Sequence, residues 1–450
     1  MSSSQPARSA RGAPDADAGH GSPTRRNPWW IPPFLGRVPD VEQRHVSLLG
    51  FVALALLFEN YDFSLLTSAL PFIAHSLDIP ERALGDFTGL IRLGALPAFL
   101  LIPFADRLGR RRVFLAAVAV LSIGTFLTGL SQTPAQFVAL QIATRTAMST
   151  AATIAFVIVA EEFPAAHRGW GIGMLGALSV FGHGLGALLF AAINVLPFGW
   201  RALYAVGVVP LLLLPRFRIG VTETERFRRQ ELAPTSALSA WLGPIRDLAR
   251  RYPWRATGIA AVGFSAAAGQ ASVYQFTAQY LLAHRGWQPG QYSTLVIVAG
   301  VTGVFGNIAA GRLGDGIGRR AVGFLFMGVF PAVAYAFFHT EDRVIPIVWS
   351  ALVFLLTAST VISRAFATEL FPTSYRGTAT GWLLANETLG AATGLALVSA
   401  GMRWGLALVT VVSLVSATSA IAAFLVLAFP ETRQRELEAI SERGSSAHAR

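Results

Sequence analysis

The sequence predicts an all-α membrane protein in which twelve transmembrane helices form two pseudo-symmetric six-helix bundles. Three observations support this fold class. The 450-residue chain is 53% hydrophobic and only 14% charged, whereas soluble domains contain about 25% charged residues. Apolar segments of about 20 residues, long enough to cross a bilayer, recur twelve times. Two charged motifs of the first half return in the second half at a nearly constant offset.

The apolar segments fall into two sets of six, which the polar stretch 218–255 separates. Residues 1–45 are polar and contain no apolar segment of the signal-peptide type, so we expect a disordered tail there. The N-terminal bundle then takes 46–217 and the C-terminal bundle takes 256–429, followed by a tail at 430–450. The expected spans are 46–74, 84–105, 113–131, 135–160, 169–193, 199–217, 256–283, 291–311, 320–338, 344–367, 377–401 and 405–429.

The arginines predict the orientation, because the chain contains no lysine and its net charge of +11 rests on arginine alone. Of the 36 arginines, 28 fall on the side of the two tails and the central loop, five on the other side and three within spans. Cytoplasmic loops are enriched in positive charge. We therefore expect a multi-pass protein of the cytoplasmic membrane with both termini in the cytoplasm. Heavy use of Ala and Arg without Lys suggests a GC-rich bacterial genome.

Two charged motifs mark equivalent places in the two halves. FADRLGRRRV at 104–113 returns 209 residues later as LGDGIGRRAV at 313–322. E-x-F-P-x3-R-G occurs at 161–169 and again at 369–377. In the first motif, a glycine is expected to reverse the chain and an aspartate to accept hydrogen bonds from arginine. Two motifs that recur in step indicate a duplicated six-helix unit, as in alternating-access transporters.

These motifs resemble those of the major facilitator superfamily, and the pattern is closest to its sugar porters and metabolite:proton symporters. FPETRQRELEAI after the last span is similar to the sugar-porter ending, and VTETERF after the sixth span is a weaker echo of it. The resemblance implies a cytoplasmic gate built from charged motifs. We expect Glu161 to pair with Arg168, and Glu369 with Arg376. The full set of expected gate residues is Asp106, Arg107, Gly109, Arg110, Arg111, Glu161, Arg168, Asp315, Gly318, Arg319, Arg320, Glu369, Arg376, Glu431 and Arg433.

Two carboxylates lie inside the first span, in the stretch ENYDFSLL. A charged carboxylate at the bilayer centre costs at least about 2.5–3.5 kcal/mol, so such residues face a protein interior and mark functional sites. The YD dipeptide resembles the first-span Tyr-Asp of the sugar porters, which implies that Asp62 responds to protons, and Glu59 lies on the same helix face. Arg145 in span four is the expected counter-charge, with Arg92 in span two as the alternative. A purely structural ion pair is the competing interpretation.

Polar residues within other spans are expected to face a substrate cavity. They are Arg92, His183, Gln270, Gln275, Gln279, Arg364, Asn386 and Glu387. Intramembrane arginines favour a carboxylate-bearing substrate, because a guanidinium group binds carboxylate through two hydrogen bonds. Span ten lacks the tryptophans of the sugar porters, which argues against a plain hexose. Interhelical hydrogen bonding remains the alternative for the glutamines, and packing remains the alternative for His183. For Arg364, the alternative to substrate contact is a place in the charged gate cluster around Glu369.

The sequence thus predicts a secondary active transporter that moves a small polar, carboxylate-bearing metabolite by alternating access, in symport with protons. Proton-antiport efflux and sugar uptake stay open as alternatives. The chain has no cysteine and no protease, hydrolase or P-loop motif, and its histidines do not cluster. We therefore expect no enzyme activity, metal site or cofactor. The expected partners are a small-molecule substrate, protons and the lipid bilayer, without nucleic acid, and a monomer is expected to form the complete pathway.

Overall fold

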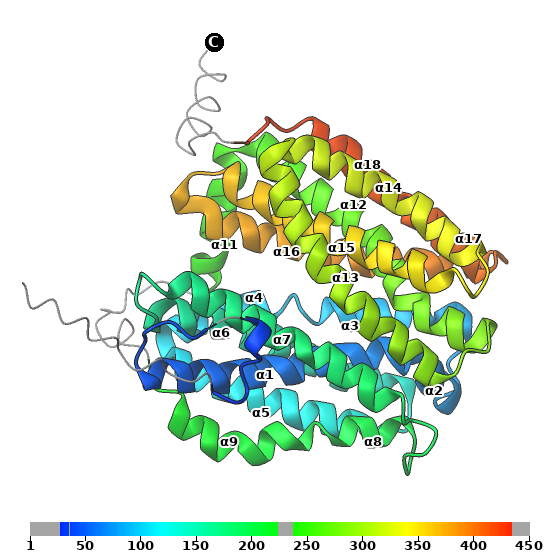
Figure 1. Cartoon of the computed structure of the whole chain (residues 1–450), viewed down its shortest axis with the longest axis horizontal. Helices are drawn as coiled ribbons and strands as arrows, with labels where there is room; N and C mark the ends of the chain where they lie inside the picture. The colour runs from blue at the N-terminus through cyan, green and yellow to red at the C-terminus, as the bar shows by residue number, and fades with distance from the viewer. Residues whose placement is uncertain (1–27, 36, 224–236, 434–450) are drawn as a thin grey trace, which may run out of the picture.

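The computed structural model describes residues 28–35, 37–223 and 237–433, and every regular element within these ranges is a helix. Most of the predicted tails at 1–45 and 430–450 lies outside them. Side chains are not described at Phe34, Pro103, Asp106 and residues 237–242. The helices form two bundles, drawn one above the other in Figure 1.

Six passages make up the N-terminal bundle, and short interruptions divide three of them into two helices each. A short helix, η1 (Pro33–Leu35), precedes the bundle. The helices are α1 (Gln43–Ser68), α2 (Leu70–Ser76), η2 (Glu81–Ala83), α3 (Leu84–Leu93), α4 (Ala98–Leu108), α5 (Arg110–Gly129), α6 (Pro134–Glu162), α7 (Arg168–Phe190), α8 (Trp200–Ala205) and α9 (Val208–Gly220).

The C-terminal bundle repeats this plan after an amphipathic helix in the central loop. Its helices are α11 (Ala237–Arg251), α12 (Pro253–Ala278), the π-helical turn η3 (Gln279–His284), α13 (Pro289–Gly316), α14 (Arg319–His339), α15 (Ile345–Glu369), η4 (Thr373–Tyr375), α16 (Arg376–Arg403), α17 (Leu408–Ser416) and α18 (Thr418–Leu427).

The described chain contains eleven helical segments that are long and apolar enough to cross a membrane. The remaining predicted span is α12, which is less apolar because it carries Gln270 and Gln275 among several small residues. With α12 included, the twelve-helix fold expected from the sequence is confirmed. The turn glycines of the repeated motif also behave alike, because Gly109 and Gly318 adopt φ values of 99° and 119°. Glycine tolerates this left-handed region at no steric cost.

Glycines allow the main helix pairs within each bundle to approach closely. In the N-terminal bundle α7 packs on α1, and a Cβ added at Gly182 would lie 2.0 Å from the carbonyl oxygen of Leu57. In the C-terminal bundle α16 packs on α12, and a Cβ at Gly390 would lie 2.1 Å from the carbonyl oxygen of Phe264. Small residues serve this purpose in membrane helices, where close packing replaces the hydrophobic driving force.

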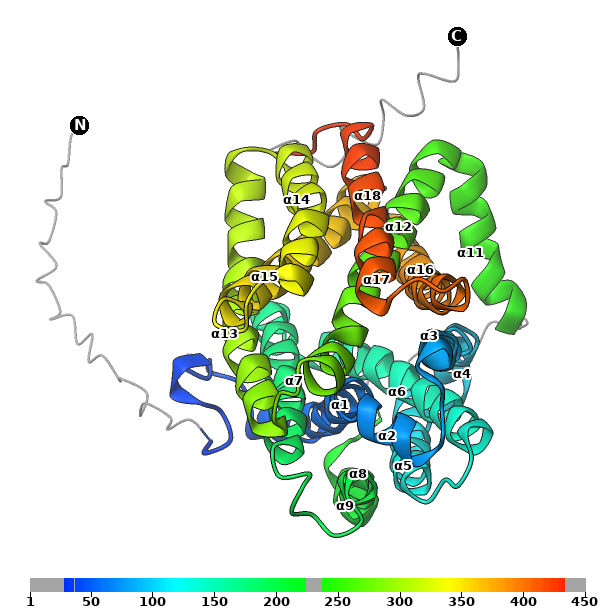
Figure 2. The same ribbon diagram turned by 90° about the vertical axis from the view of Figure 1, so that its right-hand side faces the viewer.

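The two bundles meet along α3 with α16 and along α7 with α13 (Figure 2). Residues 28–35, 37–42, 221–223 and 428–433 lie at one end of the helices, called here the terminal face (Figure 1). The other end, called the opposite face, holds connections such as 77–80 and 285–288. Near the opposite face, a Cβ at Gly85 of α3 would lie 2.0 Å from the carbonyl oxygen of Leu395. The halves are therefore in tight backbone contact there.

Candidate transport site and gates

The first passage places both intramembrane carboxylates in the N-terminal bundle. The Asp62 side chain is fully buried, and its Oδ1 accepts a hydrogen bond from Thr125 Oγ1 of α5 at 2.8 Å. Its Oδ2 has no hydrogen-bond partner among the described residues. Glu59 lies one turn earlier on α1 and is partly buried. Buried polar atoms are normally satisfied, so an unpartnered carboxylate oxygen indicates a place for a proton, a water or a ligand.

Two arginines converge on the ring of Phe63, next to Asp62. The guanidinium carbon of Arg145 on α6 lies 4.8 Å from the ring centroid, and that of Arg92 on α3 lies 5.0 Å from it. Arg145 attracts both Asp62 and Glu59 electrostatically. In the described structure, however, no ion pair within 4 Å joins it to either carboxylate, and its Nε and Nη2 atoms have no partner. The direct Asp62–Arg145 pair expected from the sequence is therefore absent from this conformation.

Aromatic side chains from both halves extend this cluster. Tyr274 of α12 lies 6.4 Å from Phe63, and Trp349 of α15 stacks on Tyr274 at 5.9 Å with an interplanar angle of 26°. The ring of His183 on α7 lies 5.5 Å from Phe63. Sequence reasoning selected His183 but missed the other three residues, because aromatic residues in a membrane span usually serve in packing. The arginine pair is thus bordered by flat, largely apolar surfaces.

Gln275 connects the two halves at the level of the arginines. Arg92 Nη2 donates to Gln275 Oε1 at 3.5 Å, which is long for a hydrogen bond. Gln275 is only 1% exposed, and its Nε2 has no partner among the residues that the structure describes. Gln270, on the same helix, instead donates to Ser419 Oγ of α18 at 3.5 Å, inside the C-terminal bundle. Of these two predicted cavity glutamines, Gln275 alone reaches the arginines.

Gln279 lies at the opposite face, in a polar contact between the halves. Its Nε2 donates to Glu81 Oε1 at 2.9 Å, and His284 Nε2 lies 2.6 Å from the same oxygen. Nearby, Asp86 of α3 forms an ion pair with Arg403 of α16. Acidic residues of the N-terminal half thus bind polar and basic residues of the C-terminal half. Sequence reasoning missed this set, since it had assigned Gln279 to the substrate cavity and the loop charges to topology.

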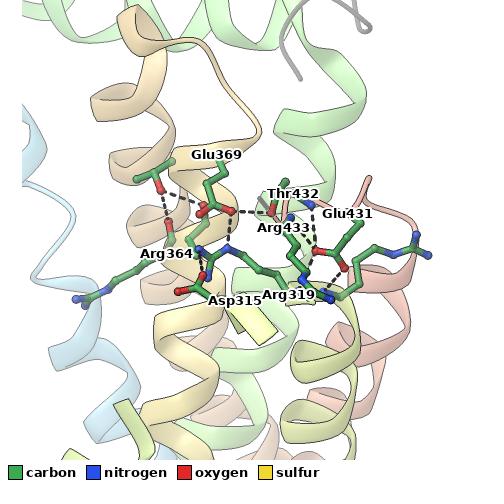
Figure 3. Close-up of polar contacts among 10 residues, drawn as sticks. Asp315, Arg319, Arg364, Glu369, Glu431, Thr432 and Arg433 are labelled. Atoms are coloured by element: carbon green, nitrogen blue, oxygen red, sulfur yellow. Dashed lines mark hydrogen bonds and ion pairs between the residues drawn. The ribbon is translucent and has the colours of Figure 1, made fainter. Parts of the chain in front are cut away.

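The last three cavity candidates lie in the C-terminal bundle. Arg364 is exposed, and its side chain points away from Glu369 in Figure 3. Arg364 and Glu387 attract one another electrostatically. Asn386 donates to the carbonyl oxygen of Trp382 at 2.8 Å and lines a groove between α12, α16 and α18. The neighbouring positions Asn386 and Glu387 therefore have different surroundings.

Each bundle carries a charged cluster at the terminal face. In the N-terminal bundle, Arg110 Nη2 pairs with Glu161 Oε1 at 3.1 Å, and both side chains are at most 10% exposed. In the C-terminal bundle, Arg319 Nε pairs with Glu369 Oε2 at 2.6 Å. Each pair joins the start of one helix to the end of the next. The two clusters are therefore equivalent parts of the repeat.

The partners of these glutamates differ from those expected. The predicted pairs Glu161–Arg168 and Glu369–Arg376 are wrong for this conformation. Arg168 is exposed, and Arg376 Nε is buried without a partner within the described ranges. The Phe-Pro step ends the helix after each glutamate, so the motif arginine begins a new helix instead of facing back. The first arginine after each turn glycine takes its place.

Backbone contacts in the two clusters repeat as well. Glu431 Oε1 accepts from the backbone N–H of Arg319 at 2.9 Å, and Oε2 accepts from that of Arg320 at 3.2 Å (Figure 3). In the N-terminal half, Glu223 Oε1 accepts from the backbone N–H of Arg111 at 3.3 Å. Glu223 and Glu431 are 208 residues apart, which matches the sequence repeat. Glu223 of the weak VTETERF echo thus makes the same kind of contact as Glu431 of FPETRQ.

The remaining gate candidates surround these contacts. Asp315 Oδ1 pairs with Arg319 Nη2 at 3.1 Å, as the motif predicts. Arg433 donates through its backbone N–H to Glu431, and Arg107 is exposed. The side chain of Asp106 lies outside the described part of the structure.

Glu431 lies outside the membrane-spanning helices and is held as a carboxylate. Burial raises its pKa, but hydrogen bonds from four backbone N–H groups outweigh burial and lower the pKa below its ordinary value. The donors are Arg319, Arg320, Thr432 and Arg433. The ionised carboxylate therefore caps the start of α14 at neutral pH.

Residues 52–392 and 259–448 match the model of the Major Facilitator Superfamily. The chain belongs to this superfamily. It is 25% identical to a gallate transporter of Pseudomonas putida, over 88% of this chain and 94% of the relative. It is 27% identical to a cis,cis-muconate transport protein of Acinetobacter baylyi, over 76% and 84% of the two chains. The fold is similar to the inward-open xylose transporter XylE of Escherichia coli, with a TM-score of 0.67 and 19% identity over 88% and 99% of the chains.

The predicted family and fold are thereby confirmed. The protein is a multi-pass membrane transporter of small molecules and not an enzyme. The clusters at the terminal face consist of residues from the charged motifs that repeat in the two halves. The cluster of Arg92, Arg145 and Asp62 instead lies near the middle of the membrane passages.

Proposed function

We propose that this protein carries a small carboxylate-bearing metabolite across the cytoplasmic membrane by alternating access, in symport with protons. The observation that carries the proposal is the cluster of Arg92, Arg145 and Asp62 around Phe63, in which Asp62 and Arg145 are buried. Intramembrane charges mark substrate and proton paths, and the guanidinium group matches the geometry of a carboxylate. The organic acids in the names of the gallate and muconate relatives support this class of cargo.

The terminal face is the proposed cytoplasmic side, with both chain ends and the central loop there. The excess of arginine on that side supports this orientation. The contacts of Glu81 and Asp86 with the other half then lie on the periplasmic side and hold the two halves together there. Because the charged cluster lies between the two bundles of one chain, a monomer is the proposed transport unit. The heavy use of Ala and Arg without Lys supports a GC-rich bacterium as the source.

Asp62 is the proposed proton carrier, with Glu59 beside it and Arg145 as the charge that responds. While Asp62 is ionised, its negative charge offsets the positive charge of Arg145. Protonation removes that compensation, and the site then attracts an anionic substrate more strongly. A proton and a monocarboxylate would thus enter together without net charge. The coupling requires that both bind differently to the two conformations.

Uptake by proteoliposomes of the purified full chain tests this function. We expect gallate or cis,cis-muconate to accumulate when an inward proton gradient is imposed, and not when the gradient is collapsed. Accumulation driven only by an outward gradient would indicate antiport efflux. Gradient-driven uptake of xylose without uptake of either acid would overturn the carboxylate assignment in favour of a sugar.

A further inference from the structure

The two central arginines have different surroundings, although both contact Phe63. Arg145 lies in the electrostatic field of Asp62 and Glu59. Arg92 has no carboxylate within 4 Å among the described residues, and the polar side chain that it contacts is Gln275. The positive charge of Arg145 is thus partly compensated by protein groups, whereas that of Arg92 is not. A positive charge in the membrane interior requires a partner.

Gln275 offers a second donor beside this uncompensated cation. Its Oε1 accepts from Arg92, but its Nε2 is buried and has no partner in the described part of the chain. A carboxylate has two oxygen atoms and accepts several hydrogen bonds. One oxygen can accept from the Arg92 guanidinium and the other from Gln275 Nε2. Because Arg92 belongs to α3 and Gln275 to α12, such a ligand would join the two halves.

The second passage changes its helix type directly after Arg92. Helix α3 ends at Leu93 and α4 begins at Ala98, and between them the backbone continues in tighter hydrogen bonds from each N–H to the carbonyl oxygen three residues earlier. Gly94 packs against α6, where its carbonyl oxygen accepts a hydrogen bond from Thr146 Oγ1 at 2.6 Å. A tighter turn of this kind in the middle of a helix is typical of a functional hinge or of local strain. The change of helix type is an observation independent of the side-chain contacts.

The surfaces around Arg92 and Gln275 suit a flat organic group. Phe63 contacts the Arg92 guanidinium, and Tyr274 with its stacked Trp349 continues the aromatic surface on the C-terminal side. Trp349 is 2% exposed, and no described residue accepts a hydrogen bond from its Nε1. Aromatic faces favour planar unsaturated groups by stacking, and the indole N–H adds one donor for a polar substituent.

We propose that Arg92 and Gln275 together form the carboxylate receptor of the transport site, whereas Arg145 belongs to the proton-coupling group. The inference rests on the proposed function and assigns its substrate contact to particular atoms. The substrate carboxylate bridges α3 and α12, so its binding draws the two halves together. Tyr274 and Trp349 hold the planar part of the substrate.

Binding of gallate and cis,cis-muconate to the purified full chain, measured by calorimetry, tests this assignment. Arg92→Gln and Gln275→Met should each raise the Kd of the acid that binds at least tenfold. Gln270→Met is the matched control, because this glutamine contacts Ser419 of α18, and its Kd should stay within twofold. Methyl gallate, which lacks the carboxylate, should bind weakly and equally to wild type and to Arg92→Gln. Arg145→Gln should make the Kd less dependent on pH than it is in wild type. Its Kd at a single pH should rise less than that of Arg92→Gln.

The unliganded melting temperature establishes that each variant is folded. If Arg92→Gln does not fold, Arg92→Lys tests the assignment instead, because lysine keeps the charge but not the planar guanidinium group. A several-fold rise in the Kd of Arg92→Lys supports Arg92 as part of the carboxylate receptor. Equal affinity of wild type, Arg92→Lys and Arg92→Gln for an acid overturns the receptor alone. Binding of neither acid by wild type overturns the receptor and the proposed function together, so the two failures are distinguishable.

Discussion

Glu431 illustrates how one side chain outside the membrane-spanning helices organises the charged cluster at the terminal face. Its carboxylate accepts four backbone hydrogen bonds at the start of α14 and in the segment after α18. Hydrogen bonds to charged groups contribute more than neutral ones. The lowered pKa of Glu431 means that the folded protein holds the ionised form. Glu223 performs the related task in the other half with fewer described contacts.

Glu431→Gln should lower the free energy of unfolding by about 1 kcal/mol near neutral pH, because the neutral amide oxygen replaces a charged acceptor. A folded pKa below the unfolded value of about 4.3 gives stability that is present above that pH. This contribution is lost as pH falls through the folded pKa. Thermal unfolding of both proteins from pH 7 to pH 3.5 checks the prediction. The difference should be constant above pH 5 and shrink below about pH 4; a difference that grows on acidification would contradict it.

Helix ends decide the arginine–glutamate pairing of the two charged clusters at the terminal face. Arg110→Ala would leave Glu161 buried without its partner, which costs about 3–5 kcal/mol for a buried pair. Arg168→Ala should change stability by less than about 0.5 kcal/mol, because this arginine is exposed. Thermal melting of the two variants in detergent measures the contrast. Equal destabilisation by both would show that Arg168, as the sequence suggested, is the partner of Glu161.

The π-helical turn η3 explains how two residues five apart reach one carboxylate. In an α-helix, positions five apart lie about 140° apart, since each residue turns about 100°. The wider turn brings Gln279 and His284 to the same side, where both contact Glu81 Oε1. π-turns of this kind occur at functional sites. The turn thus builds one half of the contact that closes the opposite face.

Glu81→Gln should weaken this contact and shift the population toward the conformation that is open at the opposite face. Asp342→Asn is the matched control, because Asp342 pairs with Arg285 at the same face but within one half. The readout is labelling by a membrane-impermeant reagent at a cysteine introduced beside the central cluster. The chain has no cysteine of its own, which makes the label specific. Equal labelling of Glu81→Gln and wild type would show that this contact does not control opening at the opposite face.

The sequence predicts the elements well but not which side chains meet. Twelve spans and the duplicated motifs follow from hydropathy and from the offset of about 208 residues. Hydropathy and the repeat offset do not predict the contacts of Gln270, Gln275 and Gln279. These contacts depend on the rotation of α12 and on the π-helical turn that follows it. Glu161 meets Arg110 only after α5 and α6 pack, 51 residues apart in the chain. Such partners depend on tertiary contacts that no local pattern encodes.

At the scale of the whole molecule, two halves meet at a central charge cluster and at the opposite face. Carboxylates of α1 lie on the N-terminal side, and Gln275 with the aromatic pair lies on the C-terminal side. In the proposed mechanism, a ligand between them changes the arrangement of the two halves, and a proton on Asp62 changes the charge near the ligand. Substrate and proton can thus shift one conformational equilibrium together, provided that each prefers the same state.

The central claim is that Asp62 couples transport to protons. Its most direct test compares Asp62→Asn with wild type in proteoliposomes, using labelled gallate or cis,cis-muconate in two assays. We predict that Asp62→Asn loses accumulation driven by the proton gradient but keeps exchange between equal internal and external substrate, because exchange needs no net proton movement. Accumulation by Asp62→Asn at the wild-type level, still dependent on the proton gradient, would contradict the account and move the proton site to another carboxylate.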